Sequence, residues 1–120
     1  MAPHQVPKPL IYLAGPFRAP TQWGITQNVH AAKEALASAA RERLYVVCPH
    51  TMTADFQGVA PDEFWLDMTL EMMRRCDAVW VFSTGRSTGT EVEVAEAERL
   101  GKPVFTDFGT LLTWAEGWEA

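Results

Sequence analysis

Short apolar runs alternate along this chain with longer segments of helical periodicity, and this alternation limits the folds that it can adopt. The run Leu10–Ala14 is followed directly by Gly15 and Pro16, as expected of a buried parallel strand that ends in a turn. Similar runs occupy residues 44–48, 78–82 and 103–106. Strands that alternate with helices in this way predict one parallel sheet covered by helices, with right-handed crossovers.

The segments between these runs have the spacing of amphipathic helices. Pro61 suits the first turn of one helix, which is expected to end near Arg75. Further helices are expected over residues 90–100 and 110–118, and a loop over residues 50–60. In the longest segment, residues 24–43, the apolar side chains recur at steps of three and four on one helix face; they are Ile25, Val29, Ala32, Leu36 and Ala39.

Length and composition fit a single α/β domain. With 120 residues, of which 48% are hydrophobic, the chain is long enough to bury a core without disulfides or metals. We expect residues 10–120 to form one Rossmann-like or flavodoxin-like domain, with a parallel sheet of four to five strands flanked by helices. Residues 1–9 contain three prolines and no apolar run, so we expect a flexible N-terminal lead-in there.

Charge and cysteine content argue against several function classes. The net charge of −5 and the scattered basic residues do not favour a nucleic acid polymer as partner, because its phosphates require clustered Lys and Arg. Cys48 and Cys76 lie far apart without a CxxC motif, which favours a reducing, cytoplasmic location. No apolar run approaches the length of a membrane span, and we expect no membrane partner, no metal and no cofactor.

The loop after the first strand is one candidate binding loop. It reads Gly15-Pro16-Phe17-Arg18, and a glycine at this place lets the backbone turn sharply and approach a ligand. The Arg18 guanidinium offers a planar set of donors to a phosphate or carboxylate. A tight turn with a solvated arginine explains the same residues equally well.

The loop after the third strand is the second candidate. Its hydroxyl-rich stretch from Ser87 to Thr90 leads into a helix N-terminus, where unpaired N–H groups and the dipole favour an anion. It is not a Walker A loop, because the Gly-Lys-Ser/Thr ending is missing. The spacing of Thr90 and Glu93 matches a capping box, and spacing alone favours this capping role for Glu93 over catalysis. Both loops follow parallel strands, so they are expected at the edge of the sheet where such folds bind ligands.

Together, the two loops and their surroundings resemble the nucleoside 2-deoxyribosyltransferase-like superfamily. The first motif is Tyr-Leu-Ala-Gly-Pro-Phe-Arg over residues 12–18, and the second is Ser-x-Gly-x-x-x-Glu over residues 87–93. The likeness spans residues 11–104 and is greatest to the short bacterial and phage members. It also includes Asn28-x-x-x-Ala32, Pro49-His50, Cys-Asp-Ala-Val at 76–79 and Gly-Lys-Pro-Val at 101–104.

This resemblance implies hydrolysis of the N-glycosidic bond of a nucleoside 5′-monophosphate, which releases the free base and (deoxy)ribose 5-phosphate. Glu93 would be the nucleophile that attacks the anomeric carbon, as in retaining glycosidases, and Tyr12 would orient it. The loop from Gly15 to Arg18, including Pro16 and Phe17, would wrap the sugar and its 5′ substituent. Base exchange between deoxynucleosides and nucleotide binding without catalysis remain alternatives.

Ser87 and Gly89 favour a phosphorylated substrate within this resemblance. Relatives that act on free nucleosides tend to carry an aspartate at the position of Ser87, whereas relatives that hydrolyse nucleoside monophosphates carry a serine. A carboxylate would repel a phosphate, but a hydroxyl near a helix N-terminus donates to it. The expected partner is therefore a nucleotide, or a nucleoside, and the resemblance also implies a homodimer or larger homo-oligomer.

The group that protonates the leaving base is not fixed by the sequence. The superfamily places an aspartate eight residues before the position of Asp77, where this chain has Thr69. Asp67 is the nearest acid, but two residues rotate a side chain by roughly 200° around a helix, so it serves only if the helix is shifted in register. His50 is a second candidate because histidine titrates near neutrality, although it suits a turn cap equally well, and loss of catalysis is a third reading. Trp65, near the start of the same helix, is expected to line the substrate site.

Overall fold

A four-stranded parallel sheet forms the centre of the computed structural model, which describes residues 7–83 and 87–120. The strand order is β2-β1-β3-β4, and the predicted α/β class with an all-parallel sheet flanked by helices is confirmed. Residues 1–6 of the expected N-terminal lead-in lie outside the described residues. The strands are β1 (Leu10–Ala14), β2 (Tyr45–Val47), β3 (Ala78–Val81) and β4 (Val104–Phe105).

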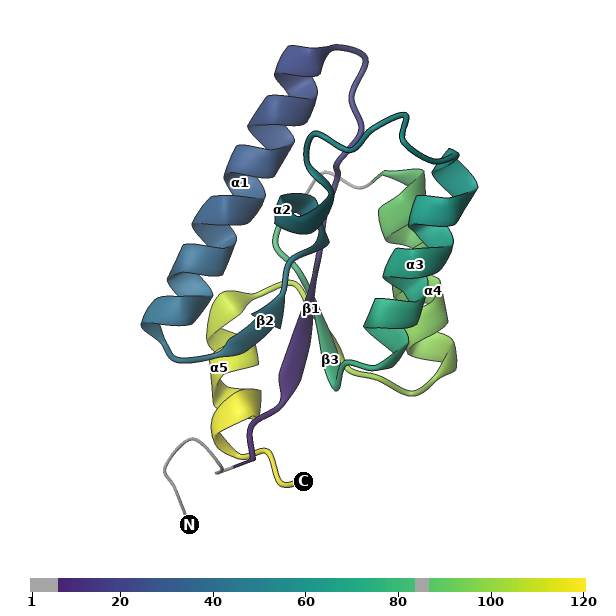
Figure 1. Ribbon diagram of the computed structural model, residues 1–120. Coiled ribbons are helices and arrows are strands. Elements are labelled where there is room, and N and C mark those ends of the chain that lie inside the picture. Colours follow the sequence, from purple (N-terminus) through teal and green to yellow (C-terminus); the bar gives the residue numbers. More distant parts are fainter. Residues whose placement is uncertain (1–6, 84–86) are drawn as a thin grey trace.

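Helices cover both faces of the sheet (Figure 1). On one face lie α1 (Gln22–Arg41) and α5 (Phe108–Glu116), and on the other lie α3 (Asp62–Arg74) and α4 (Thr88–Arg99). Within the described residues, none of these helices combines the length and the apolar character that a membrane crossing requires.

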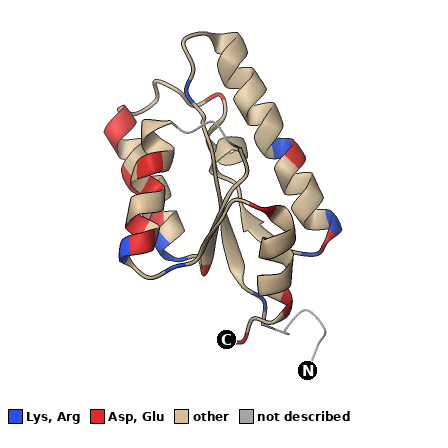
Figure 2. Cartoon of the chain, turned by 180° about the vertical axis from the view of Figure 1, so that it is seen from behind, with Lys and Arg blue, Asp and Glu red and all other residues tan. Residues whose placement is uncertain are grey.

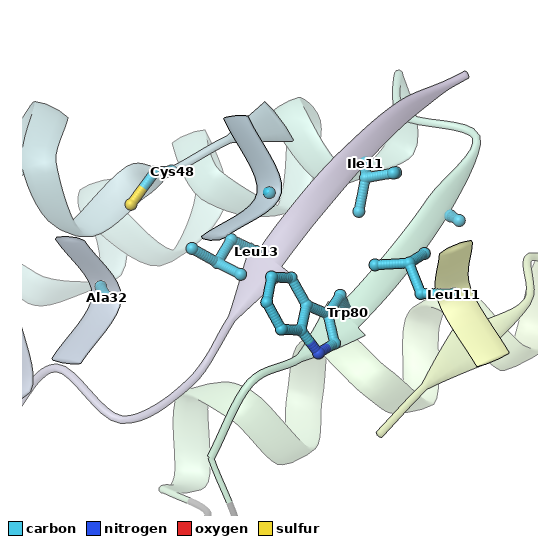
Figure 3. Packing of buried hydrophobic residues seen from close by; sticks show 8 residues of the cluster. Ile11, Leu13, Ala32, Cys48, Trp80 and Leu111 are labelled. Carbon is cyan, nitrogen blue, oxygen red and sulfur yellow. The ribbon is translucent and has the colours of Figure 1, made fainter. Parts of the chain in front are cut away.

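The alternation of side chains along β1 divides the core into two halves. Ile11 and Leu13 face α1 and α5, where they pack with Trp80 and Leu111 (Figure 3). Tyr12 and Ala14 point to the opposite face, toward α3 and α4. Because successive side chains of a strand alternate between faces, the phenol of Tyr12 is directed beneath α3 and α4, and α4 begins at the second candidate loop.

A pair of hydrogen bonds fixes the start of β1 against the start of β3. The Asp77 carboxylate accepts from the Leu10 N–H at 2.8 Å, and the Asp77 N–H donates to the Leu10 carbonyl at 2.7 Å. The resulting register places Ala14 opposite Val81 at the far end of the two strands. The loops that follow β1 and β3 therefore leave the same edge of the sheet.

The region expected to be a loop over residues 50–60 begins with a short helix instead, α2 (Pro49–Thr53). Proline suits the first turn of a helix because its ring presets φ and it has no N–H to leave unpaired. The Thr53 hydroxyl donates back to the Pro49 carbonyl at 2.8 Å, and the Thr51 hydroxyl donates to the Cys48 carbonyl at 3.0 Å. The turn after β2 is thereby tightened, and it brings His50 to the edge of the sheet that carries the two loops.

Candidate active site

Tyr12 and Glu93 form a buried pair at the carboxyl edge of the sheet. The Tyr12 hydroxyl donates a hydrogen bond to Oε2 of Glu93, across 81 residues of sequence. Tyr12 is fully enclosed and Glu93 is only 7% exposed. A strand and a helix therefore hold a carboxylate and a phenol together inside the protein, where a carboxylate requires hydrogen-bond partners to be tolerated.

The capping role that the spacing favours for Glu93 is wrong. Helix α4 begins at Thr88, and Ser87 is its N-cap, with the Ser87 hydroxyl accepting from the Thr90 N–H at 3.2 Å. Glu93 consequently lies in the second turn of α4, too far along the helix to reach the N-cap, and its carboxylate turns inward to Tyr12. The serine hydroxyl satisfies the helix terminus, which leaves the glutamate free for another role.

Burial controls the protonation of this pair. It raises the pKa of the Glu93 carboxyl above its ordinary value, while hydrogen bonds from Tyr12 and from Thr69 act in the opposite direction. It also raises the pKa of the Tyr12 phenol, and the negative charge of Glu93 adds to that rise. Tyr12 thus remains a hydrogen-bond donor at any physiological pH and orients the carboxylate without competing for its proton.

Thr69 of α3 contacts the pair from the opposite wall. Its hydroxyl donates to the Leu66 carbonyl at 3.2 Å, and it lies near enough to the pair to lower the pKa of both Tyr12 and Glu93. An ion pair between Arg74 Nε and Glu96 Oε2, 2.8 Å apart, links α3 to α4. The two helices are thereby held so that Thr69 and Glu93 meet.

A pocket of about 410 Å³ opens above the pair, within the range of sites that hold small organic ligands. It lies between the loop after β1, helix α2, the first turns of α3 and the start of α4. The residues of the sequence prediction that line it are Tyr12, Gly15, Phe17, Arg18, His50, Trp65, Ser87, Gly89 and Glu93. Thr88 and Thr90 of the predicted hydroxyl-rich stretch also line it, and lining residues that were not predicted include Thr53, Gln57, Asp62 and Leu66.

Asp67 is placed elsewhere, and its assignment to the site needs correction. It lies on the outer side of α3, in a shallow depression with Phe64, Met68 and Glu71. Helix α3 has no register shift that would turn Asp67 inward, so the rotation between positions 67 and 69 leaves Thr69 in the pocket. Pro16 also does not line the pocket; its carbonyl faces His50 instead.

His50 fixes the loop after β1. Its Nε2 lies 3.1 Å from the Gly15 carbonyl and 3.0 Å from the Pro16 carbonyl, so this nitrogen carries a proton and donates. Burial lowers the pKa of His50, although these two contacts raise it in part. Because its Nε2–H donates to the two loop carbonyls, the neutral His50 ring is a positioning group. Its buried Nδ1 has no hydrogen-bond partner among the described residues.

Arg18 stands at the mouth of the pocket. Its guanidinium forms an ion pair with Asp62, the first residue of α3, at 2.6 Å, and both side chains are more than half exposed. An exposed pair of this kind contributes little to stability, so the arginine exchanges partners at small cost. Across the mouth, the first N–H groups of α4 lie at the positive end of the helix dipole. The mouth therefore combines a cation with a helix N-terminus.

Within the part of the chain that the structure describes, no group of three or more His, Cys, Asp or Glu side chains is gathered as a metal ion would require. The groups that line the described pocket include the buried Glu93 carboxylate, the Tyr12 phenol, the His50 imidazole and several hydroxyls, with the Arg18 guanidinium and the Asp62 carboxylate at its mouth.

The fold and the pocket define an α/β protein with an all-parallel sheet and a buried carboxylate at the carboxyl edge of that sheet. The chain belongs to the family described as Domain of unknown function (DUF7768), whose model matches residues 9–107. No curated protein matches the sequence.

Proposed function

We propose that the protein hydrolyses the N-glycosidic bond of a nucleoside 5′-monophosphate. The observation that carries the proposal is the buried Glu93 carboxylate, oriented by the Tyr12 hydroxyl at the floor of a pocket. A carboxylate shielded from water is a more reactive nucleophile toward carbon than a solvated one, and retaining glycosidases use one in this way.

In the first step, a carboxylate oxygen of Glu93 bonds to the anomeric carbon of the sugar while the carbon–nitrogen bond to the base breaks. The electron pair of that bond leaves with the base. A water molecule then attacks the anomeric carbon, the ester to Glu93 breaks, and the carboxylate is restored with release of sugar 5-phosphate. The water gives up one proton, and a neutral base takes up one proton on the nitrogen that it has freed, so the reaction balances. Tyr12 holds the carboxylate during both steps, because its own raised pKa keeps it protonated.

The mouth of the pocket supports a phosphorylated substrate. Ser87, the N-cap of α4, and Thr88 and Gly89 of its first turn line the pocket, where N–H groups and hydroxyls suit a phosphate. Arg18 lies on the opposite rim and can exchange Asp62 for the phosphate. The aromatic rings of Phe17 and Trp65 line the same pocket and suit the base.

The direct test is incubation of the purified protein with a panel of nucleoside and deoxynucleoside 5′-monophosphates, followed by chromatography for released base. Release of base with water as the only acceptor supports hydrolysis. Release that requires a second free base would show base exchange instead. If Glu93→Ala and the wild type bind nucleotide equally and neither releases base, the protein is a nucleotide-binding module.

Ser87→Asp is expected to lower the affinity for the monophosphate on the order of 10-fold or more relative to the matching nucleoside. Aspartate caps a helix as well as serine does, so folding should be preserved, while its charge repels the phosphate. Isothermal titration with a nucleoside and its 5′-monophosphate measures the ratio. Ser87→Asn is the matched control, since it caps without charge, and an equal loss in both variants would contradict phosphate binding at this position.

Tyr12→Phe is expected to move the acid limb of the pH–rate profile to higher pH. The hydrogen bond from Tyr12 lowers the pKa of Glu93, so its removal leaves the carboxyl harder to ionise, and activity near neutrality should fall on the order of 10-fold. The measurement is kcat/KM from about pH 4 to pH 9. Tyr45→Phe is the control, because it makes the same change at a half-exposed tyrosine of β2. If the acid limbs of the wild type and Tyr12→Phe coincide, Tyr12 does not set the protonation of Glu93.

A further inference from the structure

The wall that faces Glu93 carries a hydroxyl rather than an acid. Thr69 lines the pocket and contacts the Tyr12–Glu93 pair. The other carboxylate that lines the pocket, Asp62, lies at the mouth, 71% exposed and in an ion pair with Arg18. This carboxylate accepts a hydrogen bond from the Arg18 guanidinium at the mouth, so it acts there as an acceptor and not as a donor to a leaving group.

This arrangement has a consequence for the base. A neutral nucleobase departs with an additional electron pair on nitrogen, and it leaves readily only when that nitrogen is protonated. General acid catalysis of this kind typically contributes a factor of 10² to 10⁴. A base that is already a cation, with a quaternised ring nitrogen bonded to the sugar or a second alkylated nitrogen in the same ring, departs as a neutral molecule and needs no proton.

We propose that the substrates of this pocket are N-glycosyl 5′-phosphates of cationic bases, of the pyridinium or N-alkylpurinium type. Such bases need no general acid, and Thr69 occupies the position from which a general acid would act. This inference rests on the proposed function, since it assumes that Glu93 attacks the anomeric carbon. The carbon–nitrogen bond breaks, its electron pair neutralises the ring, and the new bond to Glu93 is hydrolysed by water. The single proton released by that water passes to solvent.

The surroundings of the pocket favour a cation. Figure 2 shows Asp and Glu concentrated on α3 and α4, and two of these carboxylates, Asp62 and Glu93, line the pocket. Trp65 lines the pocket, with its Nε1–H held by the Ala60 carbonyl at 3.2 Å, and Phe17 lines it from the loop after β1. A cation over an aromatic face is attracted by the negative face of the ring, and a neutral base of the same shape lacks this attraction.

Two matched pairs of substrates test the inference. Nicotinamide mononucleotide and its reduced, uncharged form differ in ring charge on a ribose, and 7-methyl-2′-deoxyguanosine 5′-monophosphate and its unmethylated parent do so on a deoxyribose. We expect kcat/KM to favour the cationic member by on the order of 10²-fold in at least one pair. Hydrolysis of the neutral member within about 10-fold of the cationic one would overturn the inference and leave the proposed function intact. If the folded protein cleaves neither member of either pair but releases base from other 5′-monophosphates of the panel, the inference is overturned and the proposed function stands. If it releases base from no member of the panel, the proposed function itself fails.

Thr69→Asp provides a second, independent readout. An acid at this place supplies the missing proton, so hydrolysis of the neutral nucleotides should rise on the order of 10-fold, and the preference for the cation should narrow. Met68→Asp is the matched control, because it adds the same charge to the outer side of α3 and should leave the preference unchanged. Equal preferences in the wild type and in a folded Thr69→Asp variant would contradict the role assigned to Thr69.

Discussion

Glu93→Gln is expected to abolish turnover and at the same time to raise the melting temperature of the protein. Loss of the nucleophile should lower kcat on the order of 10³-fold or more. Glutamine has nearly the same shape, and its amide oxygen accepts from the Tyr12 hydroxyl as the carboxylate does. The substitution therefore removes the reactive charge while it preserves the packing around it.

The gain in stability follows from the raised pKa of Glu93. Because the folded protein binds this proton more tightly than the unfolded chain does, the contribution of Glu93 is most favourable below the unfolded pKa. It is lost as the pH rises through the raised folded pKa. Glutamine does not ionise, so the variant should become more stable than the wild type as the pH increases, with a melting temperature roughly 2–6 °C higher at neutral pH.

Thermal unfolding of both proteins across pH 4 to 8 checks this result. Glu98→Gln is the control, since it makes the same substitution at an exposed position of the same helix and leaves the buried carboxylate in place. If the Glu93→Gln variant is less stable than the wild type at every pH, ionisation of the buried Glu93 does not lower the stability of the folded protein. A stable variant with normal turnover would exclude Glu93 as the nucleophile.

The strands were predictable because their apolar runs end at turn residues. The bounds of β1 coincide with the expected Leu10–Ala14. Helix starts were predicted two residues late at α1, α4 and α5, because apolar periodicity locates the body of a helix and not its first residue. The signal that was overlooked is the capping side chain just before each start, Thr21, Ser87 and Asp107, which accepts from a backbone N–H.

The site was predictable where it depends on topology and unpredictable where it depends on tertiary contacts. Parallel strands end at the same edge of the sheet, so the meeting of the two loops follows from the strand order. Whether Asp67 or Thr69 faces the pocket follows from helical rotation. Because α3 has no register shift, the rotation turns Thr69 inward and Asp67 outward. The partnership of Glu93 with Tyr12 rather than with its own helix start depends on the depth at which α4 packs, which local spacing does not contain.

Gly15→Ala is expected to destabilise the protein by about 2–3 kcal/mol, an overpacking cost. A Cβ at this position would lie 3.0 Å from Cδ1 of Phe82 and closer still to Cε1 and Cζ of the same ring. The ring has little room to retreat, because it packs edge-on against His50 with the centroids 5.6 Å apart. His50 in turn holds the Gly15 and Pro16 carbonyls, so the displacement passes into the loop that lines the pocket.

Two further variants separate this clash from a general effect of alanine. Gly89→Ala adds its Cβ 3.8 Å from the Ser87 hydroxyl in the first turn of α4, where alanine is the better helix former by up to about 1 kcal/mol, so its melting temperature should not fall. Phe82→Leu removes part of the ring, and in that background Gly15→Ala should cost less than it does in the wild type. Chemical denaturation of the four members of this double-mutant cycle measures the coupling. A cost for Gly15→Ala that is the same in both backgrounds would show that the loop after β1 depends on the glycine for a reason other than the Phe82 ring.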